Sequence, residues 1–239
     1  MARIFHRRKQ PIVEAIGQTM VFLSFVGAVL YGGGWYPDGL LWQVTAKASA
    51  VSFLVLFVLV TSQTTNHLIL LLALTASVLG DVLLALPGEN SFLRGLLAFF
   101  VAHIFYVGLF IKNRLEFEDV SSTRIQISGL VIAAAGIGAF LLYQSNLDSM
   151  LIPVMAYTTV LTLMTVSALF SRFPIKLVGT GAVLFLISDS ILGAQTFLDV
   201  NLGGSISVWV SYYLGQLFLA LGVMLYDERP THFGGYRFD

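Results

Sequence analysis

Apolar residues dominate eight separate segments of the chain, and short polar or glycine-rich stretches divide each segment from the next. Each segment has about 18 residues or more, which is enough for a helix to cross a hydrocarbon core of about 30 Å. Gly32-Gly33-Gly34 and Pro87-Gly88 are typical of turns that end such helices. The pattern predicts membrane-spanning helices over residues 12–31, 41–60, 68–86, 92–111, 125–143, 150–170, 177–197 and 206–226.

The composition agrees with a membrane protein. Hydrophobic residues make up 57% of the chain, charged residues only 11%, and the mean hydropathy is +0.85, whereas a soluble domain has about 25% charged residues. We interpret residues 1–239 as one all-α polytopic membrane domain, with a basic start at 1–10 and a polar tail at 227–239. The formal net charge of zero does not indicate nucleic-acid binding, and the absence of cysteine excludes disulfides and thiolate metal sites.

The basic residues are distributed unequally between the two ends of the predicted helices. Arg94 alone lies in the loops of one side, and eleven basic residues lie on the other. Loops on the cytoplasmic side of a membrane carry an excess of positive charge, so both termini are predicted to be cytoplasmic. The favoured membrane is the bacterial inner membrane, or the endoplasmic reticulum if the protein is eukaryotic. The eleven are Arg3, Arg7, Arg8, Lys9, Lys112, Arg114, Arg124, Arg172, Lys176, Arg229 and Arg237.

Two aspartates interrupt the apolar segments, Asp81 in the third and Asp189 in the seventh. A carboxylate at the centre of a membrane helix costs about 3 kcal/mol on insertion scales, so such residues usually face the bundle interior and are functional. A structural alternative is a hydrogen bond to a neighbouring hydroxyl such as Ser77 or Ser188. The aspartates are 108 positions apart, and this offset also relates the two groups of four helices, which indicates a possible parallel four-plus-four repeat.

Other polar residues are predicted to lie at a similar depth in the non-cytoplasmic half of the bilayer, from the helical rise of 1.5 Å per residue. A shared layer favours a polar cavity. Each residue also has a structural explanation: a lysine can extend its charge to the interface, a histidine can join two helices, and tyrosines can belong to an interfacial belt. The candidate substrate-binding residues are Lys47, His103, Tyr106, Tyr157, Ser188, Tyr212, Tyr213 and Gln216.

Several kinds of chemistry do not fit these residues. Of four histidines only His103 is predicted to be buried, which disfavours a multi-histidine zinc site, and no G-x-S-x-G nucleophile motif is present. No metal or other cofactor is therefore predicted. Two carboxylates close together in a low dielectric do not both ionise readily, so one is expected to hold a proton and the other to act as a base.

The polar residues belong to short motifs that occur in order along nearly the whole chain. They are Ser77-Val78-Leu79-Gly80-Asp81, Gly95-Leu96-Leu97-Ala98-Phe99, Ala102-His103-Ile104-Phe105-Tyr106, Pro153-Val154-Met155-Ala156-Tyr157, Gly181-Ala182-Val183-Leu184-Phe185 through Ser188-Asp189, and Tyr212-Tyr213 with Gln216. Together they resemble the lysoplasmalogenase-like (YhhN) family of eight-span membrane hydrolases. One position departs: the family lysine is usually followed by proline, but Ala48 follows Lys47.

The resemblance implies hydrolysis of the vinyl ether bond of lysoplasmalogens, which releases a fatty aldehyde and a glycerophospho-ethanolamine or -choline. Its implied partners are a lysophospholipid substrate and membrane lipids; no oligomeric state follows. Proton delivery to a vinyl ether needs an acid, a base and restricted water, for which Asp81 and Asp189 are the predicted catalytic residues. Lys47 or Arg94 suits the phosphate of the head group. A proton-coupled transporter or a lipid-binding protein is the competing interpretation, since membrane-embedded charges and repeats occur there too.

Overall fold

A computed structural model of the chain describes residues 11–145, 147–198, 200 and 202–227. Within these residues, eight helices are long and apolar enough to cross a membrane, which confirms the predicted all-α, eight-span architecture of an integral multi-pass membrane protein. The helices are α2 (Pro11–Gly32), α3 (Leu40–Thr61), α4 (Thr65–Ala85), α5 (Ser91–Lys112), α6 (Ser122–Gln144), α7 (Leu151–Leu169), α8 (Thr180–Phe197) and α9 (Gly204–Asp227).

Three helix starts differ from the prediction by three residues: those of α4, of α6 (Ser122 instead of residue 125) and of α8 (Thr180 instead of residue 177). Helix α4 begins at Thr65, three residues before the predicted start, because the Thr64 side chain accepts a hydrogen bond from the backbone N–H of His67 and caps the first turn. A π-helical stretch, Ile175–Gly179, follows Pro174 and leads directly into α8. Hydropathy does not distinguish the polar first turn of α4 from a loop, or the π-helical stretch from an α-helix.

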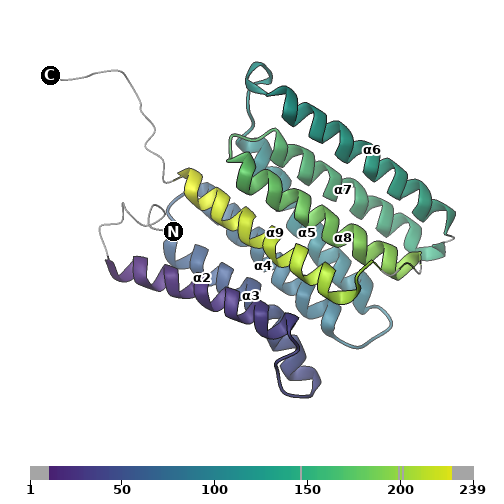
Figure 1. Cartoon of the computed structure of the whole chain (residues 1–239), viewed down its shortest axis with the longest axis horizontal. Coiled ribbons are helices and arrows are strands. Elements are labelled where there is room, and N and C mark those ends of the chain that lie inside the picture. Colours follow the sequence, from purple (N-terminus) through teal and green to yellow (C-terminus); the bar gives the residue numbers. More distant parts are fainter. Residues whose placement is uncertain (1–10, 146, 199, 201, 228–239) are drawn as a thin grey trace.

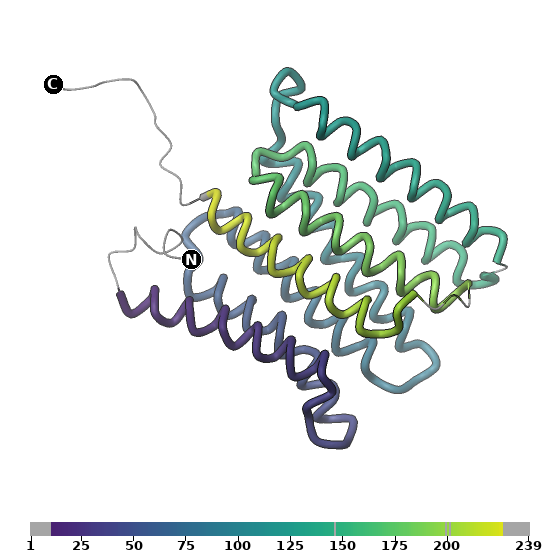
Figure 2. The backbone as a smooth tube through the Cα atoms, in the orientation of Figure 1, coloured from purple at the N-terminus to yellow at the C-terminus, as the bar shows by residue number. Residues whose placement is uncertain are grey.

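Helix α9 lies at the centre of the bundle and packs against α8, α4, α3 and α2 (Figures 1 and 2). Within its most apolar 18 residues 61% are buried, against 17% for α6. Helix α6 lies along the upper edge of the molecule in Figure 1 and packs mainly against α7. Helix α9 is therefore in a position to contact the predicted polar residues of several neighbouring helices.

Close contact between α8 and α9 depends on two glycines. A Cβ atom on Gly181 would lie 2.9 Å from the carbonyl oxygen of Gly215, and one on Gly215 would lie 3.0 Å from the carbonyl oxygen of Gly181. Small residues allow membrane helices to approach in this way, where dispersion contacts and hydrogen bonds replace a hydrophobic driving force. The contact holds α8, and hence Asp189, against the central helix.

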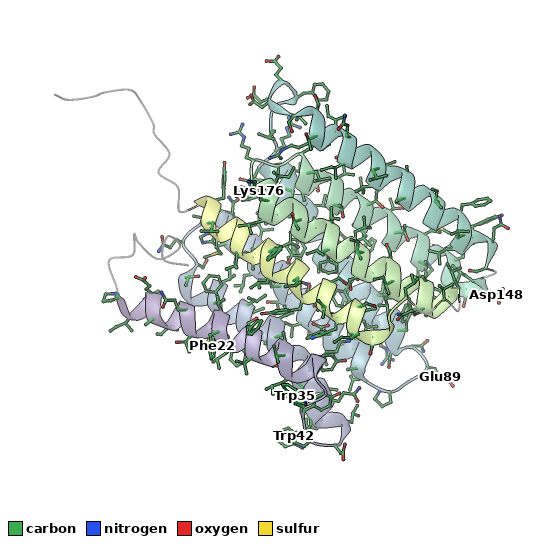
Figure 3. All side chains as sticks on the ribbon, viewed as in Figure 1. Phe22, Trp35, Trp42, Glu89, Asp148 and Lys176 are labelled. Atoms are coloured by element: carbon green, nitrogen blue, oxygen red, sulfur yellow. The ribbon has the colours of Figure 1, made fainter. Side chains whose placement is uncertain are left out.

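The two ends of the bundle carry different residues. Figure 3 shows Lys176 at one end, and Trp35, Trp42, Glu89 and Asp148 at the opposite end. At the Lys176 end, Arg124 donates hydrogen bonds to the carbonyl oxygens of Leu169 and Ser171 (2.6 and 2.7 Å) and so caps the C-terminus of α7. The basic residues predicted at 3–9 and at 229 and 237 lie outside the described residues, so the cytoplasmic placement of the termini stays a prediction, as does the four-plus-four repeat.

Candidate active site

Asp81 is buried near the end of α4, where side chains from two other helices contact its two carboxylate oxygens. The hydroxyl of Tyr212 on α9 donates a hydrogen bond to Oδ2 at 2.7 Å. The ammonium nitrogen of Lys47 on α3 lies 3.9 Å from Oδ1. Lys47 is thus directed toward the carboxylate inside the bundle, although its stem is long enough to reach the interface.

A directed series of hydrogen bonds extends this arrangement to α5. The Tyr106 hydroxyl donates to Oε1 of Gln216 at 2.7 Å, and Nε2 of Gln216 faces the Tyr212 oxygen at 3.4 Å. All three side chains are buried. Because a tyrosine hydroxyl has one proton, the donation by Tyr212 to Asp81 leaves its oxygen as the acceptor for Gln216. The series therefore points toward the carboxylate.

Asp189 on α8 has a separate set of partners. The hydroxyl of Tyr157 on α7 donates to its Oδ2 at 2.5 Å, and the same hydroxyl oxygen lies 3.0 Å from Nε2 of His103 on α5. Since the tyrosine proton is directed at the carboxylate, Nε2 of His103 must be the donor, which assigns the proton to that nitrogen. Nδ1 of His103 is then a buried acceptor without a hydrogen-bond partner among the described residues.

Aromatic rings lie between the two carboxylate groups. Phe185 contacts His103 edge to face at 4.8 Å and Tyr212 at 5.4 Å between ring centroids. Phe99 makes similar contacts with Phe185 and Tyr212. Such edge contacts fix ring orientations. The six helices α3, α4, α5, α7, α8 and α9 thus contribute polar side chains to one layer, in which Asp81 and Asp189 are held separately.

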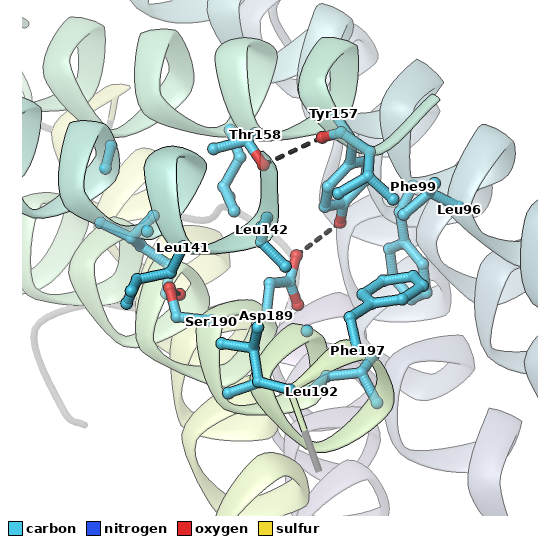
Figure 4. A pocket seen from close by; sticks show the side chains of 18 of the residues that line it. Leu96, Phe99, Leu141, Leu142, Tyr157, Thr158, Asp189, Ser190, Leu192 and Phe197 are labelled. Carbon is cyan, nitrogen blue, oxygen red and sulfur yellow. Dashed lines mark hydrogen bonds between the residues drawn. The ribbon is translucent and has the colours of Figure 1, made fainter. Parts of the chain in front are cut away.

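Two adjoining cavities meet at Asp189. A polar cavity of about 250 Å³ is bounded by Lys47, Asp81, Ser188, Gln195 and Tyr212, among others. A second cavity of about 340 Å³ is largely apolar and extends between α5, α6, α7 and α8. Asp189 lines both, and Figure 4 shows it in the apolar cavity, directed toward Tyr157 with Leu142 and Phe197 nearby. The arrangement suits an amphiphilic ligand with its polar end at Lys47 and its apolar end between the helices.

The structure brings most predicted site residues together in this layer, whereas Ser188 and Tyr213 have other hydrogen-bond partners and Arg94 lies apart. Ser188 lines the polar cavity, but its hydroxyl donates to the Val208 carbonyl oxygen at 2.9 Å and so also joins α8 to α9. The Tyr213 hydroxyl lies 3.2 Å from Ser24 on α2, and its ring borders a separate outer hollow. Arg94 is exposed on α5 and lines neither cavity.

Sequence reasoning missed several cavity residues. Tyr31 and Trp209 form one wall of the polar cavity, with their rings 4.4 Å apart, and Gln195 lies at the same cavity. Tyr31 and Gln195 are close to helix ends, where polar and aromatic residues are common, so the sequence pattern did not distinguish them. Phe99 lies within a recognised motif, but an apolar residue in an apolar helix carries no chemical signal.

The acids and histidines of this layer do not form a metal site. In the described part of the chain, no three histidine, aspartate or glutamate side chains lie close enough together to hold a metal ion. What the arrangement offers is two carboxyl groups, one lysine ammonium and three tyrosine hydroxyls in a largely apolar enclosure. Proton transfer is the chemistry that such groups support.

Comparisons with known proteins agree with the motifs. The family model described as the YhhN family matches residues 42–223, which contain all the residues of both carboxylate networks. No solved structure gives a significant match to this chain.

Curated relatives extend over much of the chain. A rat protein named lysoplasmalogenase TMEM86B is 30% identical over 210 residues, which cover 87% of this chain and 84% of the rat protein. A Mycobacterium bovis protein named lysoplasmalogenase is 29% identical over 161 residues, 67% of this chain. Human lysoplasmalogenase TMEM86B is 31% identical over 152 residues, 64% of this chain. The matched region spans 62% of the length of both the mycobacterial and the human protein.

Proposed function

Since this chain belongs to the YhhN family, we propose that it hydrolyses the vinyl ether bond of lysoplasmalogens, releasing a fatty aldehyde and a glycerophospho-base. The names of its relatives support this activity. The observation that carries the proposal is the position of Asp189 at the junction of a polar and an apolar cavity. In a lysoplasmalogen the vinyl ether lies between the glycerol head and the hydrocarbon chain, so it reaches Asp189 when each end of the lipid occupies the matching cavity.

The two carboxyl groups suit different roles. One oxygen of Asp81 faces the Lys47 ammonium and the other accepts from Tyr212, and these two contacts stabilise a carboxylate against the cost of its burial. Asp189 accepts from Tyr157 through Oδ2 alone, so its Oδ1 is the position for an acidic proton. We assign Asp189 as the general acid and Asp81 as the carboxylate that stabilises positive charge and accepts a proton from water.

The reaction follows from this assignment. Asp189 transfers its proton to the vinyl carbon remote from the ether oxygen, and the ether-bearing carbon becomes an oxocarbenium ion. Water adds to that carbon and gives a proton to Asp81, and transfer of this proton to Asp189 returns the carboxyl pair to its starting state. The resulting hemiacetal collapses to the aldehyde and the free glycerol hydroxyl. The apolar surroundings restrict water and strengthen the electrostatic effect of the carboxylate on the cation.

Isotope experiments on purified protein in detergent test both the activity and the bond broken. In heavy water with rapid trapping, the aldehyde is expected to carry one solvent deuterium beside its carbonyl. In ¹⁸O-labelled water, the glycerol product is expected to stay unlabelled, because water adds to the vinyl carbon. Heavy oxygen in the glycerol product would contradict the mechanism.

The same preparation separates a hydrolase from a transporter. Hydrolysis needs no compartments, so aldehyde release is expected in detergent micelles. If lysoplasmalogen is left intact in detergent while the protein moves it across a sealed vesicle membrane, the competing transporter function is correct.

A further inference from the structure

The apolar cavity has walls of small, aliphatic and aromatic residues, mainly on α5, α6, α7 and α8, and its polar groups are few. Tyr157, Thr158, Asp189 and Ser190 are the hydroxyl and carboxyl side chains along it. Its volume of about 340 Å³ is near the lower end of the range of about 300 to 1,000 Å³ found for ligand pockets. A single hydrocarbon chain fits this shape and polarity.

Exposed residues at the rim show where the cavity opens. Leu141 on α6 is 48% exposed although it lines the cavity, and Ala134 on α6 and Ser190 on α8 are also exposed lining residues. Helix α6 packs mainly against α7 and is the least buried of the eight helices. The mouth therefore lies between α6 and α8 on the outer face of the bundle, where the acyl chains of the bilayer are.

Two glycines on opposite walls of the cavity have empty space where a side chain would be. A Cβ atom added to Gly138 on α6, or to Gly193 on α8, meets no atom within 4 Å. Both residues line the cavity, and Gly193 lies one turn beyond Asp189 on the same helix. They differ from Gly181 and Gly215, where an added Cβ atom would lie only 2.9 to 3.0 Å from backbone atoms of the neighbouring helix. Side chains at 138 and 193 would fill the cavity without displacing a helix.

We propose that this cavity binds the hydrocarbon chain of the lysolipid, that the chain enters from the bilayer between α6 and α8, and that Gly138 and Gly193 set the length of chain accepted. The inference rests on the proposed function, since that function supplies the lipid. The polar cavity beyond Asp189 holds the head group, so chain and head lie on opposite sides of the reacting bond.

A pair of variants on one helix gives the test. Gly138→Leu fills the cavity, whereas Gly136→Leu adds the same side chain on α6 at an exposed position that also has no atom within 4 Å and does not line the cavity. Each methylene group of the substrate that the new side chain keeps out of the cavity is expected to lower kcat/KM about fourfold. Exclusion of two or three methylene groups therefore predicts a fall of roughly 15- to 60-fold in kcat/KM for a hexadecenyl substrate. An octenyl substrate is expected to lose much less, and Gly193→Leu to reproduce the effect.

Equal losses on both substrates, or the same loss in Gly136→Leu, would overturn the chain-binding site. A second readout does not depend on hydrolysis. A saturated ether lysolipid with a photoreactive diazirine at the chain end is expected to label residues 122–144 and 180–197, and Gly138→Leu to reduce the labelling. Labelling only of α2 and α3 would contradict the proposal. If wild-type protein is labelled as expected but releases no aldehyde, the proposed function fails and the chain site stands.

Discussion

At the scale of single residues, the tyrosines decide how each aspartate is presented. Tyr157 and Tyr212 each donate to one carboxylate oxygen, and each is itself held by a side chain from α5 or α9, His103 or Gln216. A buried carboxylate without such donors would be costly. Among the described residues the donors of Asp189 all face Oδ2 and leave Oδ1 without one, whereas both oxygens of Asp81 have partners.

Removing either carboxyl group is expected to abolish turnover. Asp81→Asn and Asp189→Asn should each lower kcat by a factor of about 100 to 10,000, the usual cost of a lost general acid or base. The double variant should be scarcely slower than either single one, because groups that act as a unit are non-additive. Aldehyde release by purified, monodisperse variants measures this. Near-normal turnover in either single variant would show that the substituted aspartate has a structural role and not a catalytic one.

Tyr157→Phe removes the donor to Asp189 and keeps the ring. As Asp189 gives up its proton, this hydrogen bond becomes one to a charged group, which contributes about 1.5 to 3 kcal/mol, so kcat is expected to fall about 10- to 100-fold. The matched control is Tyr213→Phe, which removes a hydroxyl whose partner is Ser24, away from both cavities. Steady-state kinetics of the two variants checks this, and a larger loss in Tyr213→Phe would support its predicted role in substrate binding instead.

At the scale of helices, the contact between α8 and α9 positions Asp189 relative to Tyr212. Gly181→Leu would force a side chain into the backbone of α9, whose nearest atoms would lie 2.9 Å from the new Cβ. Overpacking of this kind costs about 1 to 3 kcal/mol, so a lower unfolding temperature in detergent is expected, together with loss of activity.

Gly108→Leu is the control for that substitution. Gly108 is an exposed position of α5, and a Cβ atom there meets nothing within 4 Å. Its unfolding temperature, measured by thermal scanning under the same conditions, should match the wild type. Equal unfolding temperatures for both variants would show that the α8–α9 contact is looser than the structure indicates.

At the scale of the whole molecule, orientation in the membrane follows from charge. Lys112, Arg114, Arg124, Arg172 and Lys176 belong to one end of the bundle, and positive charge favours the cytoplasmic side. Reporter fusions at residue 118, between α5 and α6, and at residue 147, between α6 and α7, are expected to report cytoplasmic and non-cytoplasmic positions respectively. Reports from the same side would contradict a membrane-spanning α6, and with it the shared depth of the polar residues.

The sequence alone predicted the eight helices and nearly all of their ends. Each membrane helix satisfies its backbone hydrogen bonds within itself, so a local apolar segment of sufficient length determines a span without reference to the others. The exceptions were helix ends that local hydrogen bonds determine, such as the start of α4, which Thr64 caps. The polar candidates were found for the same reason, because a charged or hydrogen-bonding side chain stands out in an apolar segment.

Only the tertiary structure decided which of these polar residues meet. Tyr157 contacts Asp189 across 32 positions and Tyr212 contacts Asp81 across 131, while the adjacent Tyr213 turns toward α2. Hydropathy is almost the same around each of these helices, so it does not specify their rotation or neighbours. Close packing at small residues such as Gly181 and Gly215 specifies both, and that packing places Asp189 where a polar cavity meets an apolar one.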